Sequence, residues 1–157
     1  MLAKRVLAIF LLGVASQVAA QGEIAEGDVL PSLMLTDQHD KPAEIPGNTR
    51  QLLFAADNSG AGLVTALLDS KEKNWLRQTR RVYLADIHKM PSLIARFVAL
   101  PQLRDKPYPI VLGREVHDLA MFSREKDCLT VMPVKEGRLK SIVFACSSEE
   151  LRSAFDE

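Results

Sequence analysis

The sequence predicts an α/β protein with one central mixed sheet flanked by helices. Between Gln51 and Leu112, apolar runs typical of buried strands alternate with segments of helical periodicity. Two more strand-like runs then lie on either side of Gly137, separated only by a short polar turn, which is typical of an antiparallel hairpin. The alternation predicts a parallel core, and the hairpin adds antiparallel strands along one side.

The composition is that of one globular domain. The 157 residues are 47% hydrophobic and 25% charged, values that suit a packed core and disfavour disorder. Lysine and arginine together number 20, as do aspartate and glutamate, so the formal net charge is +0. Without a basic excess the chain lacks the electrostatic attraction that nucleic-acid binding needs, and we expect no nucleic-acid partner.

The first twenty residues have the organisation of a secretory signal peptide. Met1–Arg5 is a short basic segment, Val6–Ala15 is apolar, and small residues follow up to Ala20. We predict cleavage after Ala20, which leaves residues 21–157 as a single domain, periplasmic or secreted, without stable membrane insertion. An uncleaved anchor is disfavoured because the apolar run is too short to span a bilayer.

The amino-terminal part of this domain is expected to form an arm, a hairpin and the central strand. Residues 21–27 are predicted to be a loose arm. Apolar runs bounded by polar turns predict strands at Leu30–Asp37 and Ala43–Ile45. Gln51–Ala56 is apolar after its first residue, as in a strand buried on both faces, so we place it at the centre of the sheet.

The middle of the chain alternates between helix and strand. Apolar residues at helical spacing predict a helix over Ala61–Gln78, and Arg81–Ile87 follows as a buried strand. A second helix is predicted over Ser92–Leu100, and Pro101 is expected to end it. Its apolar side chains are Leu93, Ile94, Phe97, Val98 and Leu100. Tyr108–Leu112 is the next predicted strand.

The carboxyl-terminal part is expected to hold a short helix, a hairpin and a closing helix. Apolar residues between Val116 and Phe122 suggest the short helix. The hairpin consists of Leu129–Val134, the turn 135–138 and Leu139–Ala145. Ser147 and Glu150 have the spacing of a capping box, which predicts the start of a helix that continues through Phe155.

Four of these segments match, in order, the elements of one known fold. They are Leu30–Pro42, Leu52–Ala56, Val131–Leu139 with Gly137 in its turn, and Ser147–Leu151. They resemble the first hairpin, the strand before the redox motif, and the final hairpin and helix of the thioredoxin fold, in its branch of secreted thiol-disulfide reductases and peroxiredoxin-like proteins. The resemblance covers nearly all of residues 21–157 and implies a thioredoxin-like fold.

The redox motif of that branch is missing. Where such enzymes carry Cys-x-x-Cys at a helix amino terminus, this chain has Ser59-Gly60-Ala61-Gly62, and residues 1–127 contain no cysteine. The helix dipole activates a thiol at that position, whereas a serine hydroxyl without a neighbouring base gains no comparable nucleophilicity. The sequence therefore excludes dithiol and peroxidase chemistry there. Members of the fold without these cysteines are usually binding or assembly modules, and the resemblance implies that role.

The loop after the central strand is the predicted binding surface. Its candidate residues are Asp57, Asn58, Ser59, Gly60 and Gly62. The first three are residue types that commonly cap helices, and a cap is the simpler interpretation. The alternative is a small anion cradled by the amides of Ser59–Gly62, which is disfavoured because no lysine or arginine lies in the loop.

Cys128 and Cys146 are the only cysteines, and they flank the predicted hairpin. Their separation across it depends on the turn. A three-residue turn that pairs Val134 with Arg138 sets them diagonally, too far apart for an unstrained bridge. A turn that pairs Lys135 with Leu139 would place them opposite each other, and a bulge at Pro133, which cannot donate to the strand ladder, could also shift the register.

Three interpretations of the cysteine pair stay open. An oxidising compartment favours a structural disulfide. Two unpaired buried thiols are the second interpretation, and a redox-active or sensing pair is the third. The resemblance implies that Cys128 falls close to the position at which the family keeps a cis-proline facing the redox site. A thiol there would face the same partner surface.

The histidines give no sign of a metal site. His39, His88 and His117 lie far apart in the sequence and are expected on the solvated surface. No His-x-x-x-His or Cys-x-x-Cys spacing occurs. We therefore predict neither a metal nor a cofactor.

The sequence supports two main hypotheses about function. The first is a non-catalytic thioredoxin-like binding or accessory module, periplasmic or secreted, whose partner is a protein or a small ligand. The second is a thiol-based redox enzyme or sensor that uses Cys128 and Cys146. A weaker third is a small-ligand binder at the glycine-rich helix start. Cycling of the two cysteines between oxidised and reduced forms at the redox potential of the cell would distinguish the second hypothesis from the others.

Overall fold

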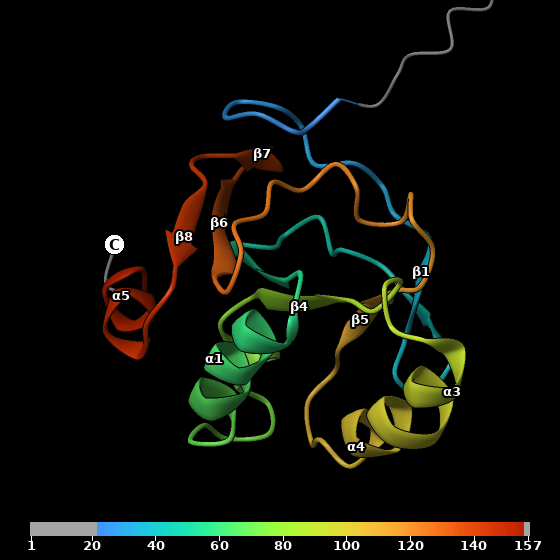
Figure 1. The fold of residues 1–157 in the computed structure, drawn as a ribbon. Helices are drawn as coiled ribbons and strands as arrows, with labels where there is room; N and C mark the ends of the chain where they lie inside the picture. Colours follow the sequence, from blue (N-terminus) through green and yellow to red (C-terminus); the bar gives the residue numbers. More distant parts are fainter. Residues whose placement is uncertain (1–21, 156–157) are drawn as a thin grey trace, which may run out of the picture.

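The computed structural model describes residues 22–155, so the predicted signal peptide and its cleavage point lie outside the described residues. Within this range eight strands form one sheet in the order β2-β1-β5-β4-β3-β6-β7, and β8 pairs with β6 (Figure 1). The strands are β1 (Leu35–Asp37), β2 (Pro42–Ala43), β3 (Gln51–Ala55), β4 (Arg81–Asp86), β5 (Val111–Gly113), β6 (Leu129–Lys135), β7 (Arg138–Leu139) and β8 (Val143–Ala145). The helices are α1 (Asn58–Leu68), α2 (Trp75–Gln78), α3 (Ser92–Ile94), η1 (Ala95–Ala99), α4 (Leu100–Arg104) and α5 (Ser148–Ser153).

The sheet has the predicted mixed character. Strands β3, β4 and β5 run parallel, whereas β6 runs antiparallel to β3 and β1 runs antiparallel to β5. All five residues of β3 are buried, and the strand lies between β4 and β6. The predicted central position of this strand is therefore confirmed. No helix within residues 22–155 is long and apolar enough to cross a lipid bilayer.

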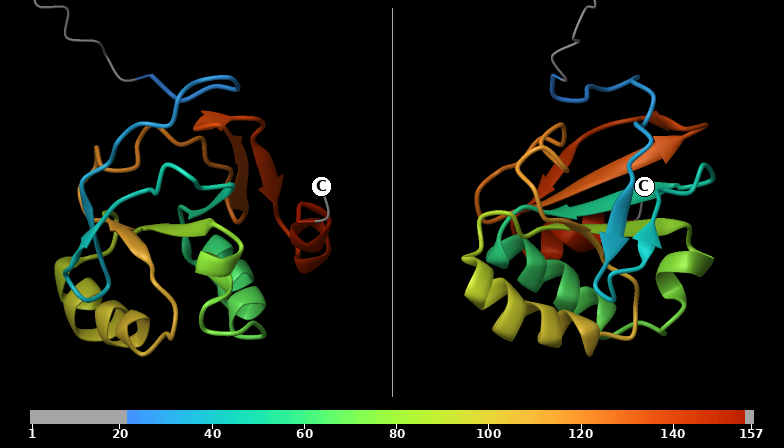
Figure 2. Two further views of the ribbon diagram at one scale, coloured as in Figure 1. Left: turned by 180° about the vertical axis from the view of Figure 1, so that it is seen from behind. Right: turned by 90° about the vertical axis from the view of Figure 1, so that its right-hand side faces the viewer.

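The two faces of the sheet are covered differently. The helices gather on one face, as Figure 2 shows, and pack there against the alternate side chains Leu53 and Ala55 of β3. Leu52 and Phe54 point to the other face. Irregular chain covers that face, with Ile24 from the amino-terminal arm and Phe122 among the buried side chains. Both faces of β3 are thus in a core.

The amino-terminal arm is not loose over its described part. The Ile24 amide donates to the Met121 carbonyl at 2.8 Å, and the Gly27 amide donates to the Leu139 carbonyl at 2.7 Å. Ile24 itself is only 7% exposed. The prediction of a free arm was wrong because it overlooked this single apolar side chain among polar neighbours.

The strands near one edge of the sheet differ in length from the prediction. Strand β1 covers only the end of the predicted Leu30–Asp37. Strands β2 and β5 replace the predicted Ala43–Ile45 and Tyr108–Leu112. One reason is Gln38, which is buried and takes the place of a neighbouring strand. Its side-chain amide donates to the Tyr108 carbonyl at 2.7 Å and accepts from the Ile110 amide at 2.9 Å. These backbone groups are satisfied without strand pairing.

The predicted helix over Ala61–Gln78 is two helices. Helix α1 begins three residues earlier, at Asn58, and ends at Leu68. The polar segment 69–74 then forms turns, in which the Ser70 hydroxyl donates to the Leu67 carbonyl. Helix α2 starts only at Trp75. Polar residues that bond to nearby backbone carbonyls compete with helix, and the apolar periodicity did not show this break.

The helix at Ser92 continues past Pro101, contrary to prediction. It runs without interruption through α3, η1 and α4 to Arg104. The η1 segment is a π-turn, in which the Leu100 amide donates to the Ala95 carbonyl, five residues back. A proline inside a regular α-helix would clash with the carbonyl four residues earlier, and a wider turn just before it relieves that contact. Of the five apolar side chains predicted for this helix, only Leu100 is buried.

The short helix predicted between Val116 and Phe122 is absent; turns and bends occupy this segment. Asp118 organises the first turn, because its carboxylate accepts from the backbone amides of Arg114 and Glu115 at 2.8 and 2.9 Å. Phe122 is fully buried, whereas Val116 is 70% exposed. The apolar residues here cover a sheet face from a loop, which helical spacing cannot distinguish from a helix.

Candidate functional site

Helix α1 begins at the predicted binding loop, and Asp57 is its cap. Asp57 has an extended backbone, with φ −151° and ψ 177°, and its Oδ1 accepts from the Gly60 amide at 2.9 Å. The predicted capping role is thus confirmed for Asp57, while Asn58 and Ser59 form the first turn. The Gly60 amide donates to the Asp57 carboxylate and the Ala61 amide donates to the Asp57 carbonyl at 3.0 Å, so at least two of the four amides of the alternative anion cradle are occupied.

The loop is fastened to the segment just before β6. The other oxygen of Asp57, Oδ2, accepts from the Asp127 amide at 2.9 Å, and the Ser59 hydroxyl donates to the Asp127 carboxylate at 2.9 Å. Asp127 has a positive φ of 62°. The carbonyl of Cys128 lies directly against the Cα of Gly60, with no room for a side chain between them. Asp57 therefore ties together segments about seventy residues apart.

This arrangement divides the predicted surface residues into two groups. Asn58, Ser59 and Gly62 are exposed, whereas Asp57 is half-buried and Gly60 is buried. The first group is available to a partner, and the second holds the loop in place. The exposed Asp127 adjoins the first group through Ser59. The sequence prediction named Asp57 and Ser59 but not their tie to Asp127.

Removal of the Asp57 carboxylate tests the tie. We expect Asp57→Ala to lower the free energy of unfolding by about 2 kcal/mol, because a helix cap and the acceptor of the Asp127 amide are lost together. Urea unfolding measures the change. Asn58→Ala is the matched control on the neighbouring exposed residue and should stay within about 0.5 kcal/mol of wild type. Equal stability of both variants would contradict the tie.

The cysteines form a disulfide, Cys128–Cys146, with their Cα atoms 4.1 Å apart. The turn between β6 and β7 has two residues, because Lys135 pairs with Arg138, so the alternative in which Val134 pairs with Arg138 is not formed. Glu136 and Gly137 both have positive φ, at 54° and 72°, as a two-residue hairpin turn requires.

One extra residue in the returning chain then brings the cysteines together. Val134 pairs with Leu139, but Val131 pairs with Val143, so the register shifts by one between β7 and β8. The shifted register, continued one step beyond β6, sets Cys128 opposite Cys146. A bulge does shift the register, as anticipated for Pro133, and its extra residue lies in the returning segment 140–142 instead.

The disulfide is buried on one side and exposed on the other. Cys128 is only 3% exposed and adjoins Gly60 through its carbonyl. Cys146 is exposed and directly precedes Ser147, the cap of α5. The predicted capping box is confirmed, since Ser147 accepts from the Glu150 amide. The disulfide thus joins the base of the α1 loop to the start of the closing helix.

Loss of the disulfide should destabilise the fold without removing it. The bridge closes a loop with a sequence separation of 18. We expect the variant Cys128→Ala/Cys146→Ala to lose about 3 kcal/mol of unfolding free energy, since the unfolded chain becomes less restricted. Urea unfolding, with and without reductant for wild type, measures this. Reduced wild type should resemble the variant; a wild type insensitive to reductant would refute the expectation.

The expectation that all three histidines are solvated was wrong for His88. Its side chain is 13% exposed, and its Nδ1 hydrogen-bonds to the Asp86 carboxylate. Asp86 also pairs with Arg124, whose Nη1 lies 2.9 Å away. His39 and His117 are exposed, as predicted. Among the residues that the structure describes, no group of three potential metal ligands converges.

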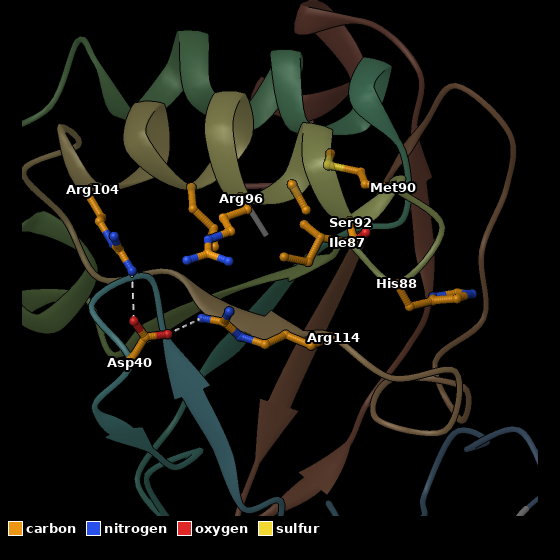
Figure 3. A pocket seen from close by; sticks show the side chains of 10 residues that line it. Asp40, Ile87, His88, Met90, Ser92, Arg96, Arg104 and Arg114 are labelled. Atoms are coloured by element: carbon orange, nitrogen blue, oxygen red, sulfur yellow. Dashed lines mark hydrogen bonds and ion pairs between the residues drawn. The ribbon is translucent and has the colours of Figure 1, made fainter.

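Sequence reasoning missed a group of charged side chains beside the Ser92–Arg104 helix. Asp40, Arg104 and Arg114 come from three separate segments and form ion pairs, and Arg96 lies beside them in the same hollow (Figure 3). No local sequence pattern predicts such a group, because its members are far apart in the sequence.

No family model and no curated protein matches the sequence. Among solved structures, the chain is similar to one from Bacteroides thetaiotaomicron described as a protein disulfide isomerase, with a TM-score of 0.56 and 14% identity over 85% of this chain and 87% of that chain. Peroxidoxin BcpB from Mycobacterium tuberculosis gives a TM-score of 0.56 and 12% identity over 85% and 96%. The thioredoxin domain of a thiol-disulfide oxidoreductase from Bacteroides vulgatus gives 0.53 and 12% over 86% and 100%. Identities this low show the fold alone: the chain has an α/β thioredoxin-like fold.

Proposed function

We propose that the chain is a non-catalytic thioredoxin-like binding or accessory module that acts in the periplasm or outside the cell. The observation that carries the proposal is the start of α1. By the resemblance, Ser59 and Gly62 take the positions of the two thiols of redox members of the fold, and both cysteines of the sequence are bonded to each other instead. A thioredoxin-like fold that keeps its shape without its nucleophile suits recognition better than electron transfer.

The exposed residues at the start of α1 offer one surface for a partner. Asn58, Ser59 and Gly62 lie together with the exposed Asp127, on a loop that Asp57 holds rigid. A loop fixed before binding loses little conformational entropy when a partner binds, and this favours recognition.

A second surface supports a protein partner. The Ser92–Arg104 helix exposes four neighbouring apolar side chains: Leu93, Ile94, Phe97 and Val98. Leu93 is 68% exposed and Phe97 is 66% exposed. Grouped apolar side chains of this size on the surface of a soluble domain commonly mark an interaction site.

An insulin-reduction assay tests the non-catalytic part of the proposal. With dithiothreitol as the reductant, the wild-type protein should not accelerate insulin reduction above the rate with dithiothreitol alone. The variant Ser59→Cys/Gly62→Cys is the positive control, because both positions are exposed and a Cβ at position 62 meets nothing within 4 Å. Acceleration by wild type would contradict the proposal.

Photo-crosslinking in the native compartment tests the binding part. A crosslinking residue placed at position 59 or at position 97 should give a discrete adduct from the surface that the partner uses. Position 70 is an exposed control that belongs to neither surface. Adducts that are the same from all three positions would refute specific binding at either surface.

A thiol-based sensor is the second candidate, and the exposure of Cys146 favours it. An exposed sulfur can be attacked by an external thiolate, which opens the bridge with Cys128 as the leaving thiol. Thiol trapping on protein taken directly from its compartment decides between the two. A fully oxidised pair supports the binding module, whereas a partly reduced pair or a mixed disulfide supports the sensor.

A further inference from the structure

A hollow beside the Ser92–Arg104 helix has the lining of a site for a small organic anion. It has a volume of about 630 Å³, within the range of ligand pockets, and lies between this helix and the edge of the sheet (Figure 3). Its lining residues include Asp40, Arg96, Arg104 and Arg114, so three cations face one anion. They come from the turn after β1, from η1, from α4 and from the chain after β5.

The single carboxylate does not neutralise the arginines. Asp40 Oδ2 lies 2.7 Å from Arg104, and its Oδ1 lies 2.7 Å from Arg114. Both oxygens are thus engaged, while one negative charge balances only one of two positive charges. Arg104 also donates to the Gln38 carbonyl at 2.8 Å, which fixes its guanidinium beside the hollow. The excess positive charge is held in place rather than spread over mobile side chains.

Arg96 adds a charge that has no acidic partner. In the described part of the chain it forms no ion pair, and its guanidinium lies 5.5 Å from the ring centre of its neighbour Phe97. No aspartate or glutamate occurs between Ile87 and Arg104 in the sequence. Figure 3 shows Arg96 extending into the hollow between Arg104 and Ser92. This guanidinium is free to bind a ligand.

Arg114 supplies an independent observation. Its Nε is buried and donates to no acceptor among residues 22–155, although its Nη2 is bonded to Asp40. Buried donors in folded proteins nearly always have an acceptor. The internal hydrogen bonds of residues 22–155 therefore do not use the full donor capacity of Arg114, which lines the hollow.

The rest of the lining is apolar. Ile87 and Leu100 are buried at the wall of the hollow, and Met90 is half-buried beside them. His88 points away from the arginines, toward Asp86. A ligand would therefore meet cations at one end and hydrocarbon at the other.

From these observations we infer that the hollow binds a small amphiphilic anion, whose carboxylate or phosphate head lies on Arg96 and Arg114 and whose hydrocarbon body lies on Ile87, Met90 and Leu100. Guanidinium groups suit both head groups because their planar N–H pairs match two oxygens. The site uses different residues from the α1 loop and from the exposed apolar side chains Leu93, Ile94, Phe97 and Val98, so it goes beyond the proposed function and can fail independently of it.

Titration of the purified, ¹⁵N-labelled protein tests the site, with the Arg114 Nε–H and Arg96 Nε–H resonances as the readout. The probes are octanoate and octyl phosphate, with inorganic phosphate as the head alone and 1-octanol as the tail alone. Octanoate or octyl phosphate should shift both resonances in a saturable way at millimolar concentration. The tighter of the two identifies the head group. Inorganic phosphate should bind about tenfold or more weakly, and octanol should not saturate.

Arg96→Gln should weaken octanoate or octyl phosphate binding by about tenfold or more, because one charged hydrogen-bond donor is lost. Arg96 is exposed and unpaired, so this variant should keep the wild-type melting temperature. Arg152→Gln, on the exposed side of α5, is the matched control and should bind like wild type. Absence of saturation with both amphiphiles, unchanged binding by Arg96→Gln, or equal binding of octanol would overturn the inference.

Discussion

Gly60→Ala is expected to lower the free energy of unfolding by about 3 kcal/mol, although alanine is the better helix former. A Cβ on residue 60 would lie 2.5 Å from the carbonyl oxygen of Cys128 and 3.1 Å from its carbonyl carbon. These are backbone atoms of a segment held by the Asp57 tie and by the disulfide, so they cannot turn aside as a side chain would. The helix start or the strand β6 must shift.

Gly62→Ala, two residues along the same helix, is the matched control for that prediction. A Cβ at this position meets nothing within 4 Å. We expect this variant to be more stable than wild type by up to about 1 kcal/mol, from helix propensity alone. Urea unfolding of the two variants should thus give changes of opposite sign. A Gly60→Ala protein as stable as wild type would contradict the close approach to Cys128.

Val111→Asp is expected to have the largest effect, a loss of at least about 4 kcal/mol. Val111 is 6% exposed in β5, and a carboxylate there would lose its hydration without gaining a partner. The register also pairs Val111 with Asp37 on β1, so the new charge would meet a like charge across the strands. Unfolding of the variant at room temperature is the expected observation by circular dichroism.

Val116→Asp makes the same chemical change five residues later, on a side chain that is 70% exposed. It should stay within about 0.5 kcal/mol of wild type. Thermal unfolding of both variants separates burial from the effect of an added negative charge. If the two variants unfold at similar temperatures, the placement of β5 inside the sheet is wrong.

The sheet was predictable because its signal is local and repeated. The apolar run at Gln51–Ala56 identifies a strand buried on both faces, and the structure places β3 there. The alternation with helices gives the parallel order. The exact ends of the strands were harder to predict. Side chains such as Gln38 form hydrogen bonds with backbone groups about seventy residues away, and such bonds do not alter the local hydrophobic pattern.

The candidate site was predictable only in part. Residue types favoured at helix caps identified Asp57, and its bond to the Gly60 amide follows from local spacing. Its second bond, to the Asp127 amide, joins residues seventy positions apart and cannot be read from either segment alone. The disulfide depends in the same way on one extra residue between β7 and β8, which changes the register without changing the alternation.

The π-turn ahead of Pro101 has a consequence for the angular positions of side chains around its helix. Arg96 and Arg104 are eight positions apart, and at about 100° per residue a regular α-helix would set them about 80° apart around the axis. A π-turn takes up one additional residue, which reduces the offset to about 20°. Both arginines therefore point to the same side of the helix, the side on which Asp40 lies. The π-turn that accommodates Pro101 thus brings Arg96 and Arg104 into line along one side of the helix.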